Sequence, residues 1–148
     1  MSLLLKSTYV HVFTAVVIFA TYGFWVFGIL GVEYFTGPDA LIRIGKSIAT
    51  LIVAGYAFEI LLTIAIVGKQ SFLLAKSGID PIDERDKQIL YKSLFNSHLV
   101  LCAGLFLSIG ALAMGVEPFW VFNAIVLAFL LSVIAELCTK LFFYHVAA

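Results

Sequence analysis

Charged side chains are scarce in this sequence of 148 residues. Aspartate, glutamate, lysine and arginine make up 12% of the chain, whereas soluble globular domains carry about 25%. Hydrophobic residues reach 63%, and the formal net charge at pH 7 is zero. This balance excludes an ordinary soluble globule and gives no electrostatic basis for binding nucleic acid. The length predicts a single domain over residues 1–148.

Sequence patterns typical of catalysis or cofactor binding are missing as well. The two cysteines, Cys102 and Cys138, lie in apolar stretches without a Cys-x-x-Cys motif, so we interpret both as small hydrophobic residues. There is no phosphate-binding loop, no His-Glu-x-x-His motif and no Glu-x-x-His motif of a di-iron bundle. We therefore predict no cofactor and no metal site, and we favour a protein without enzymatic activity.

Four long apolar stretches make up most of the chain. Residues 7–32 contain no Asp, Glu, Lys or Arg, and at about 1.5 Å per residue they can cross a hydrocarbon core of about 30 Å. The fold class predicted from these stretches is an all-α membrane protein, a four-transmembrane-helix bundle built from two tandem helical hairpins. Its helices are expected at residues 7–32, 41–67, 81–116 and 118–144.

The longest polar run, residues 80–93, lies between the two predicted hairpins. It holds four of the nine acidic residues and three of the nine lysines and arginines. Asp80 before Pro81, with Asp83 in the first turn, is typical of a helix start. We therefore predict that the third helix begins outside the bilayer, within a loop over residues 68–92, and enters it after the polar run.

Lysine and arginine divide unequally between the two predicted sides of the membrane. Arg43 and Lys46 fall on one side. Seven fall on the other: Lys6, Lys69, Lys76, Arg85, Lys87, Lys92 and Lys140. Because positively charged loops stay in the cytoplasm, we predict that both termini and the 68–92 loop are cytoplasmic, in a cell inner membrane. Two Phe-Trp-Val-Phe clusters, at residues 24–27 and 119–122, then lie at the outer interface.

Small residues recur four positions apart in the third predicted helix. They include Ser93 and Ser97, and Gly104 and Ser108. Small side chains let helix backbones approach closely, which is the main packing device available in lipid. We therefore predict a close helix contact along this face, and a homo-oligomer that associates through such faces.

Each predicted span contains one histidine or glutamate in its apolar part: His11, Glu59, His98 and Glu136. Ionisable groups are costly in hydrocarbon and are functional candidates for that reason. Counting from the turns places all four toward the cytoplasmic side, where a cluster could pass protons or bind a cation. Alternatively, His11, His98 and Glu136 reach the headgroup level, and Glu59 is protonated and hydrogen-bonded to a neighbouring helix.

The two halves of the chain show a weak internal similarity. Residues 31–35 and 115–119 agree at four of five positions, and both segments follow an odd-numbered predicted helix. A duplicated hairpin, related by a pseudo-two-fold axis along the membrane normal, would explain the match. Coincidence is the alternative, because apolar chains draw on few residue types.

Residues 83–86, Asp-Glu-Arg-Asp, followed by Ile89, resemble a segment of small uncharacterised prokaryotic integral membrane proteins. In that family an Asp-Glu-Arg-x-x-x-Ile segment precedes a helical hairpin near the C-terminus. The likeness extends from about residue 80 to the end of the chain and includes residues 118–121. It implies that the first three residues of the segment matter, and it brings no established activity with it.

Three functions stay open at this stage. We favour a non-enzymatic oligomeric membrane protein that engages a cytoplasmic protein partner through residues 80–93, with candidate contacts at Asp83, Glu84, Arg85 and Asp86. The plain alternative for this segment is a capped helix start whose charges satisfy one another. The other two functions are a small proton- or cation-coupled transporter using Glu59, and a haem-binding redox bundle with His11 and His98 as axial ligands.

Overall fold

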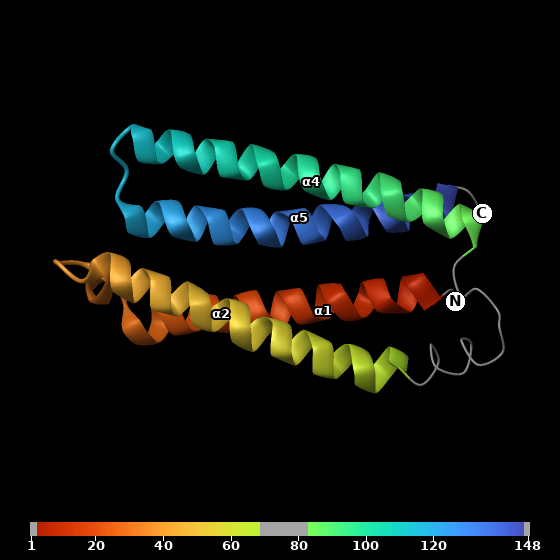
Figure 1. Ribbon diagram of the computed structural model, residues 1–148, viewed down its shortest axis with the longest axis horizontal. Coiled ribbons are helices and arrows are strands. Elements are labelled where there is room, and N and C mark those ends of the chain that lie inside the picture. The colour runs from red at the N-terminus through yellow and green to blue at the C-terminus, as the bar shows by residue number, and fades with distance from the viewer. Residues whose placement is uncertain (1–2, 69–82, 147–148) are drawn as a thin grey trace.

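The computed structural model describes residues 3–68 and 83–146, and the regular secondary structure in this part of the chain is all helical (Figure 1). The first helical segment comprises α1 (Leu3–Gly23) and the π-helical η1 (Phe24–Leu30), followed by a short 3-10 turn, η2 (Val32–Phe35). The second comprises α2 (Ala40–Thr63) and the π-helical η3 (Ile64–Gly68). The last two helices are α4 (Glu84–Ala113) and α5 (Pro118–Val146).

Four of these segments are long and apolar enough to cross a membrane. They are Thr8–Leu30, Ala40–Ile66, Glu84–Ala113 and Pro118–Tyr144. The prediction of an all-helical chain with four such spans is therefore confirmed. Length and composition indicate a multi-pass membrane protein.

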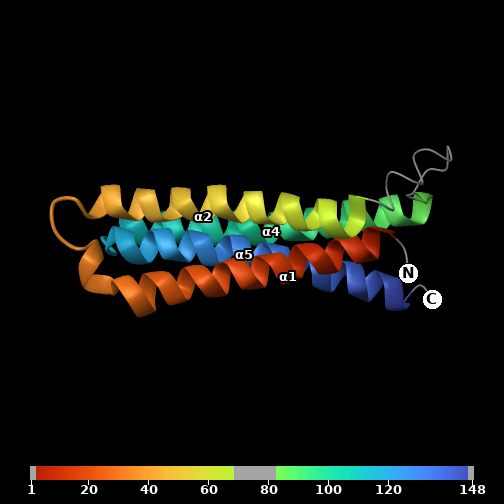
Figure 2. The ribbon, with the colours of Figure 1, turned by 90° about the horizontal axis from the view of Figure 1, so that it is seen from below.

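The axes of the four long helices are roughly aligned in a single bundle, and consecutive helices run in opposite directions (Figures 1 and 2). α4 and α5 pack along their length and form the most extensive pair, whereas α1 packs against both α2 and α5. The starts of α1 and α4 lie at the same end of the bundle as the end of α5. The turns that follow η1 and α4 lie together at the opposite end.

Aromatic side chains form the core at the turn end of the bundle. Phe119, at the start of α5, stacks on Phe35 of η2 with ring centroids 4.9 Å apart. The same ring meets Phe27 of η1 edge to face at 5.7 Å. The same buried cluster also contains Tyr22, Val26, Ile44 and Val126. Residues from both predicted Phe-Trp-Val-Phe clusters thus pack against each other.

Glycine ends the first and third long helices in the same way. Gly31 and Gly115 have φ angles of 74° and 84°, in the left-handed region that L-residues with side chains disfavour. After η1 the Gly31 N–H donates to the Val26 carbonyl at 3.1 Å, and after α4 the Val116 N–H donates to the Ala111 carbonyl at 3.1 Å. These bonds satisfy carbonyls that a helix end would otherwise leave free.

The boundaries of the third helix differ from those predicted. Asp83, and not Asp80, caps the described helix, because its carboxylate accepts a hydrogen bond of 2.7 Å from the Glu84 N–H. The helix ends at Ala113 instead of residue 116, because the turn at Gly115 stops it. Asp80, Pro81 and most of the predicted 68–92 loop lie outside the described residues. The other spans start or end within four residues of their predicted bounds.

α4 and α5 approach each other very closely at Gly104. A Cβ atom placed on Gly104 would lie only 2.4 Å from the Cβ of Ala128, a separation that real atoms do not reach. On the same face of α4, Ser93 and Ser108 are buried, and the Ser108 hydroxyl donates to the Gly104 carbonyl at 2.8 Å. The predicted small-residue contact is thus confirmed within the chain.

We expect Gly104→Ala to destabilise the bundle, because the added methyl group would force α4 and α5 apart at a cost of about 1–3 kcal/mol. Gly110→Ala is the matched control, since its Cβ would meet nothing within 4 Å and alanine favours a helix by up to about 1 kcal/mol over glycine. Thermal unfolding in detergent should lower the midpoint for Gly104→Ala alone. Equal midpoints for the two variants would contradict the close contact.

Candidate functional site

His11 of α1 and Glu59 of α2 meet between their helices. The Nδ1 atom of His11 contacts the Oε1 atom of Glu59 and forms an ion pair when the imidazole is protonated. The approach depends on Gly55, where an added Cβ would lie 3.3 Å from the Ile18 side chain. Glu59 follows Gly55 by one turn, and His11 precedes Ile18 by two turns, so both side chains face the same helix seam.

The His11–Glu59 pair is accessible from outside the bundle. The side chains are 47% and 29% exposed, so other protein atoms cover neither of them fully. A histidine and a carboxylate held together from two helices can exchange a proton with each other or with water. Of the four intramembrane candidates, these two are the ones that the structure brings together across helices.

The other two candidates pair within their own helices. His98 of α4 is exposed and its Nε2 lies 3.4 Å from the Cys102 Sγ. Glu136 of α5 forms a salt bridge with Lys140, one turn further on. The four residues therefore do not form a common cluster, and nowhere in residues 3–68 and 83–146 do three or more His, Cys, Asp or Glu side chains gather as a possible metal site.

Sequence reasoning missed how deeply Lys140 is buried. Its side chain is only 4% exposed, and the Glu136 carboxylate balances its charge. Nearby, the Asn96 side chain of α4 donates to the Thr139 hydroxyl of α5 at 3.2 Å. The i,i+4 spacing of Glu136 and Lys140 allows them to pair, but it does not show that the pair faces inward. These contacts add polar links to the α4–α5 interface.

The start of α4 is tied to the end of α5. The Tyr144 hydroxyl donates to the carboxylate of Asp86, which is buried. The Lys92 ammonium lies over the Phe143 ring, 4.7 Å from its centroid. Asp83 serves as the helix cap. Two of the four partner-binding candidates therefore have structural roles within the chain: Asp83 caps α4, and Asp86 binds Tyr144.

The remaining charged residues of this segment are on the surface. The Glu84 side chain is 82% exposed and pairs with Lys87 at 2.9 Å. Arg85 is exposed and makes no ion pair with another described residue. Gln88 and Tyr91 are exposed on the same side of α4, and sequence reasoning did not single them out. We call Glu84, Arg85, Gln88 and Tyr91 the α4 end face.

The chain was compared with protein-family models, curated proteins and solved structures, and none of them matches it. The resemblance of residues 83–89 to small prokaryotic membrane proteins therefore stays a prediction. The haem alternative also gains no support from the geometry, because His11 contacts Glu59 and His98 contacts Cys102.

We expect Tyr144→Phe to loosen the first turns of α4. The substitution leaves the buried Asp86 carboxylate without its phenol donor, and a hydrogen bond to a charged group contributes about 1.5–3 kcal/mol. Hydrogen–deuterium exchange of the backbone amides in residues 84–90 should become faster. Tyr91→Phe is the control, since the exposed Tyr91 ring makes no such bond. Unchanged exchange in Tyr144→Phe would show that the tie to Asp86 does not hold the helix start.

Proposed function

We propose that this chain is a non-enzymatic membrane protein that acts by association, and that the α4 end face docks a cytoplasmic protein partner. The observation that carries this proposal is the exposure of Glu84 and Arg85 on a helix start that the Asp86–Tyr144 bond ties to α5. The Glu84 and Arg85 charges therefore lie on a helix surface that is already ordered in the absence of a partner.

The composition of the α4 end face also supports docking. Arginine and tyrosine are enriched where proteins bind one another, and the face contains exposed Arg85 and Tyr91. Tyr91 is 71% exposed although it is a large aromatic residue. Because the helix start is already fixed, a partner would lose little conformational entropy in binding it. Opposite charges side by side at Glu84 and Arg85 favour a complementary surface over a non-specific one.

We propose the orientation in which the α4 end face lies in the cytoplasm. The excess of lysine and arginine falls at this end of the chain's spans. The starts of α1 and α4 and the end of α5 share this end (Figure 1), so one assignment places both termini inside. A bacterial inner membrane is the proposed location.

Self-association and duplication of the hairpin are weaker parts of the proposal. The small-residue face at Gly104 and Ser108 is used between α4 and α5, so an oligomer would need another surface. The matched glycines Gly31 and Gly115 play the same role in their turns, which favours duplication. Against it, His11 pairs across helices and His98 does not.

Replacing both Glu84 and Arg85 by alanine should reduce recovery of the partner by at least tenfold, because hot-spot residues each contribute more than about 1 kcal/mol. Asp83 stays intact, since it caps the helix. The assay is quantitative mass spectrometry of proteins that copurify from gently solubilised native membranes. The matched control replaces the exposed Glu33 and Glu117, at the other end of the bundle. A partner that both double variants retain equally would not bind at the α4 end face.

Proton- or cation-coupled transport is the second candidate, and the His11–Glu59 contact favours it. The pair joins α1 and α2, which interact less extensively than α4 and α5 do. Protonation could break the His11–Glu59 contact and deprotonation could restore it, which would couple proton binding to a movement of α1 relative to α2. A single four-helix bundle offers little room for a substrate path, so this function would need at least two copies.

Glu59→Gln should abolish pH-driven flux if the pair transfers protons, because the amide cannot ionise. The measurement uses proteoliposomes with a trapped pH-sensitive dye and an imposed pH gradient. Glu33→Gln, an exposed glutamate in a turn, should leave the flux unchanged. Full flux through Glu59→Gln, or no flux through the native chain above that of empty liposomes, would remove transport from consideration.

A further inference from the structure

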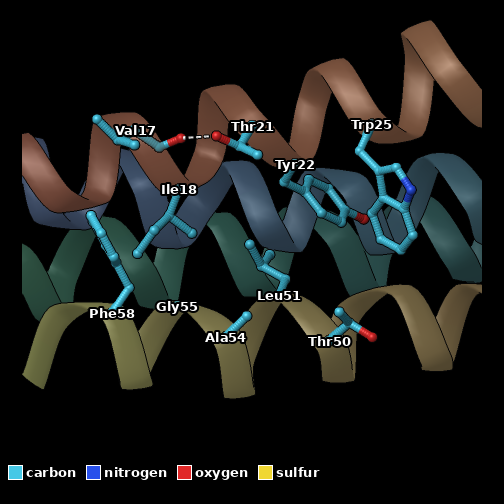
Figure 3. A pocket seen from close by; sticks show the side chains of 10 residues that line it. All are labelled: Val17, Ile18, Thr21, Tyr22, Trp25, Thr50, Leu51, Ala54, Gly55 and Phe58. Carbon is cyan, nitrogen blue, oxygen red and sulfur yellow. Dashed lines mark hydrogen bonds between the residues drawn. The ribbon is translucent and has the colours of Figure 1, made fainter. Parts of the chain in front are cut away.

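A groove of about 340 Å³ runs between α1 and α2 (Figure 3). Its lining extends from residue 17 to 25 on the first helical segment and from 50 to 58 on α2, which at the helical rise is about 12 Å on each side. The residues that matter for its shape are Ile18, Tyr22, Trp25, Ala54, Gly55 and Phe58. The groove exists because α2 touches α1 closely at Gly55 and less closely toward the turn end.

The two threonine hydroxyls that line the groove are already satisfied. The Thr21 hydroxyl donates to the Val17 carbonyl at 2.8 Å, as Figure 3 shows. The Thr50 hydroxyl donates to the Lys46 carbonyl at 2.9 Å. The remaining surface is aliphatic and aromatic. Such a slot, parallel to helices that are long enough to cross a membrane, suits a hydrocarbon chain and offers nothing to a polar ligand.

A cation stands at the end of the groove nearest the turn. Lys46 precedes Thr50 by one turn on the same side of α2, is exposed, and makes no ion pair within the described chain. Helical side chains lean toward the N-terminus of their helix, so the Lys46 ammonium extends beyond the groove toward the membrane surface. Its neighbour Arg43 is already engaged, because it donates to the Tyr34 carbonyl at 2.7 Å and lies over the Tyr34 ring.

We propose that this groove binds one acyl chain of an anionic phospholipid and that the lipid phosphate pairs with Lys46. The site matches the layout of a phospholipid. The Lys46 ammonium lies near the membrane surface, where the phosphate would be, and the apolar groove runs inward, where the acyl chain would be. Trp25 lies at the same end of the groove, where indole rings favour the headgroup level. The proposal is independent of the partner-docking function.

The binding can be measured through Trp25. The sequence has two tryptophans, so Trp120→Phe leaves Trp25 as the only one. This variant is placed in lipid nanodiscs of phosphatidylcholine that contain increasing amounts of phosphatidylglycerol brominated in its acyl chains, which quenches nearby indoles. A cation near the membrane surface favours an anionic lipid by about fivefold. We expect phosphatidylglycerol to quench Trp25 at about one fifth of the mole fraction that brominated phosphatidylcholine needs.

Two further substitutions in this background test the two halves of the site. Ala54→Phe fills the groove and should abolish the saturable quenching, whereas Ala57→Phe, at an exposed alanine outside the lining, should not. Lys46→Gln should keep the quenching but lower the preference for phosphatidylglycerol to about one. Because Lys46 is exposed, this variant should fold even if Ala54→Phe does not.

Four results would overturn the proposal. Equal quenching by both brominated lipids in the Trp120→Phe variant would mean that no anionic lipid is selected. Unchanged quenching in a folded Ala54→Phe variant would mean that the chain lies outside the groove. Protection of Trp25 from both lipids would mean that another protein segment, such as a second copy, fills the groove. Loss of quenching on adding soluble glycerol phosphate would assign Lys46 to a free phosphate instead of a lipid.

Discussion

The close contact of α4 with α5 at Gly104 and Ala128 is the constraint on which the other features depend. Lipid provides no hydrophobic drive for helices to associate, so tight packing and polar contacts must hold them together. This contact keeps α4 and α5 together along their length, which allows Tyr144 to reach Asp86. The ordered start of α4, and the surface that it presents, follow from that packing.

The first two helices are held differently, and both remaining candidate sites lie between them. α2 is anchored to α1 at Gly55 and joined to it by the His11–Glu59 contact, and it packs less extensively than the α4–α5 pair. Looser packing leaves room for the groove around Gly55 and leaves the polar pair next to it accessible. The bundle thus combines a tightly packed pair, α4 and α5, with a more loosely packed pair, α1 and α2, that can accept lipid or change its contacts.

The fold could be predicted from the sequence to a large extent, because span length and the absence of charge decide where helices cross a membrane. Contacts between residues one turn apart, such as Glu136 with Lys140, can be inferred from spacing, because such residues share a helix face. Contacts between helices did not. Counting from the turns gives the depth of His11 and His98 but not their direction around the helix, so it could not show that only His11 reaches a glutamate. The bond from Tyr144 to Asp86 joins residues 58 positions apart, and local patterns carry no signal for it.

We propose that the α4 end face binds a protein in the cytoplasm, and photocrosslinking in native membranes can test this binding. A photoreactive phenylalanine analogue at Gln88, which is exposed beside Glu84 and Arg85, should yield one protein adduct of defined mass. The same analogue at Phe106, which is 76% exposed in the middle of α4, should yield only lipid adducts. Lipid adducts alone at Gln88, or the same protein adduct at both positions, would contradict the account.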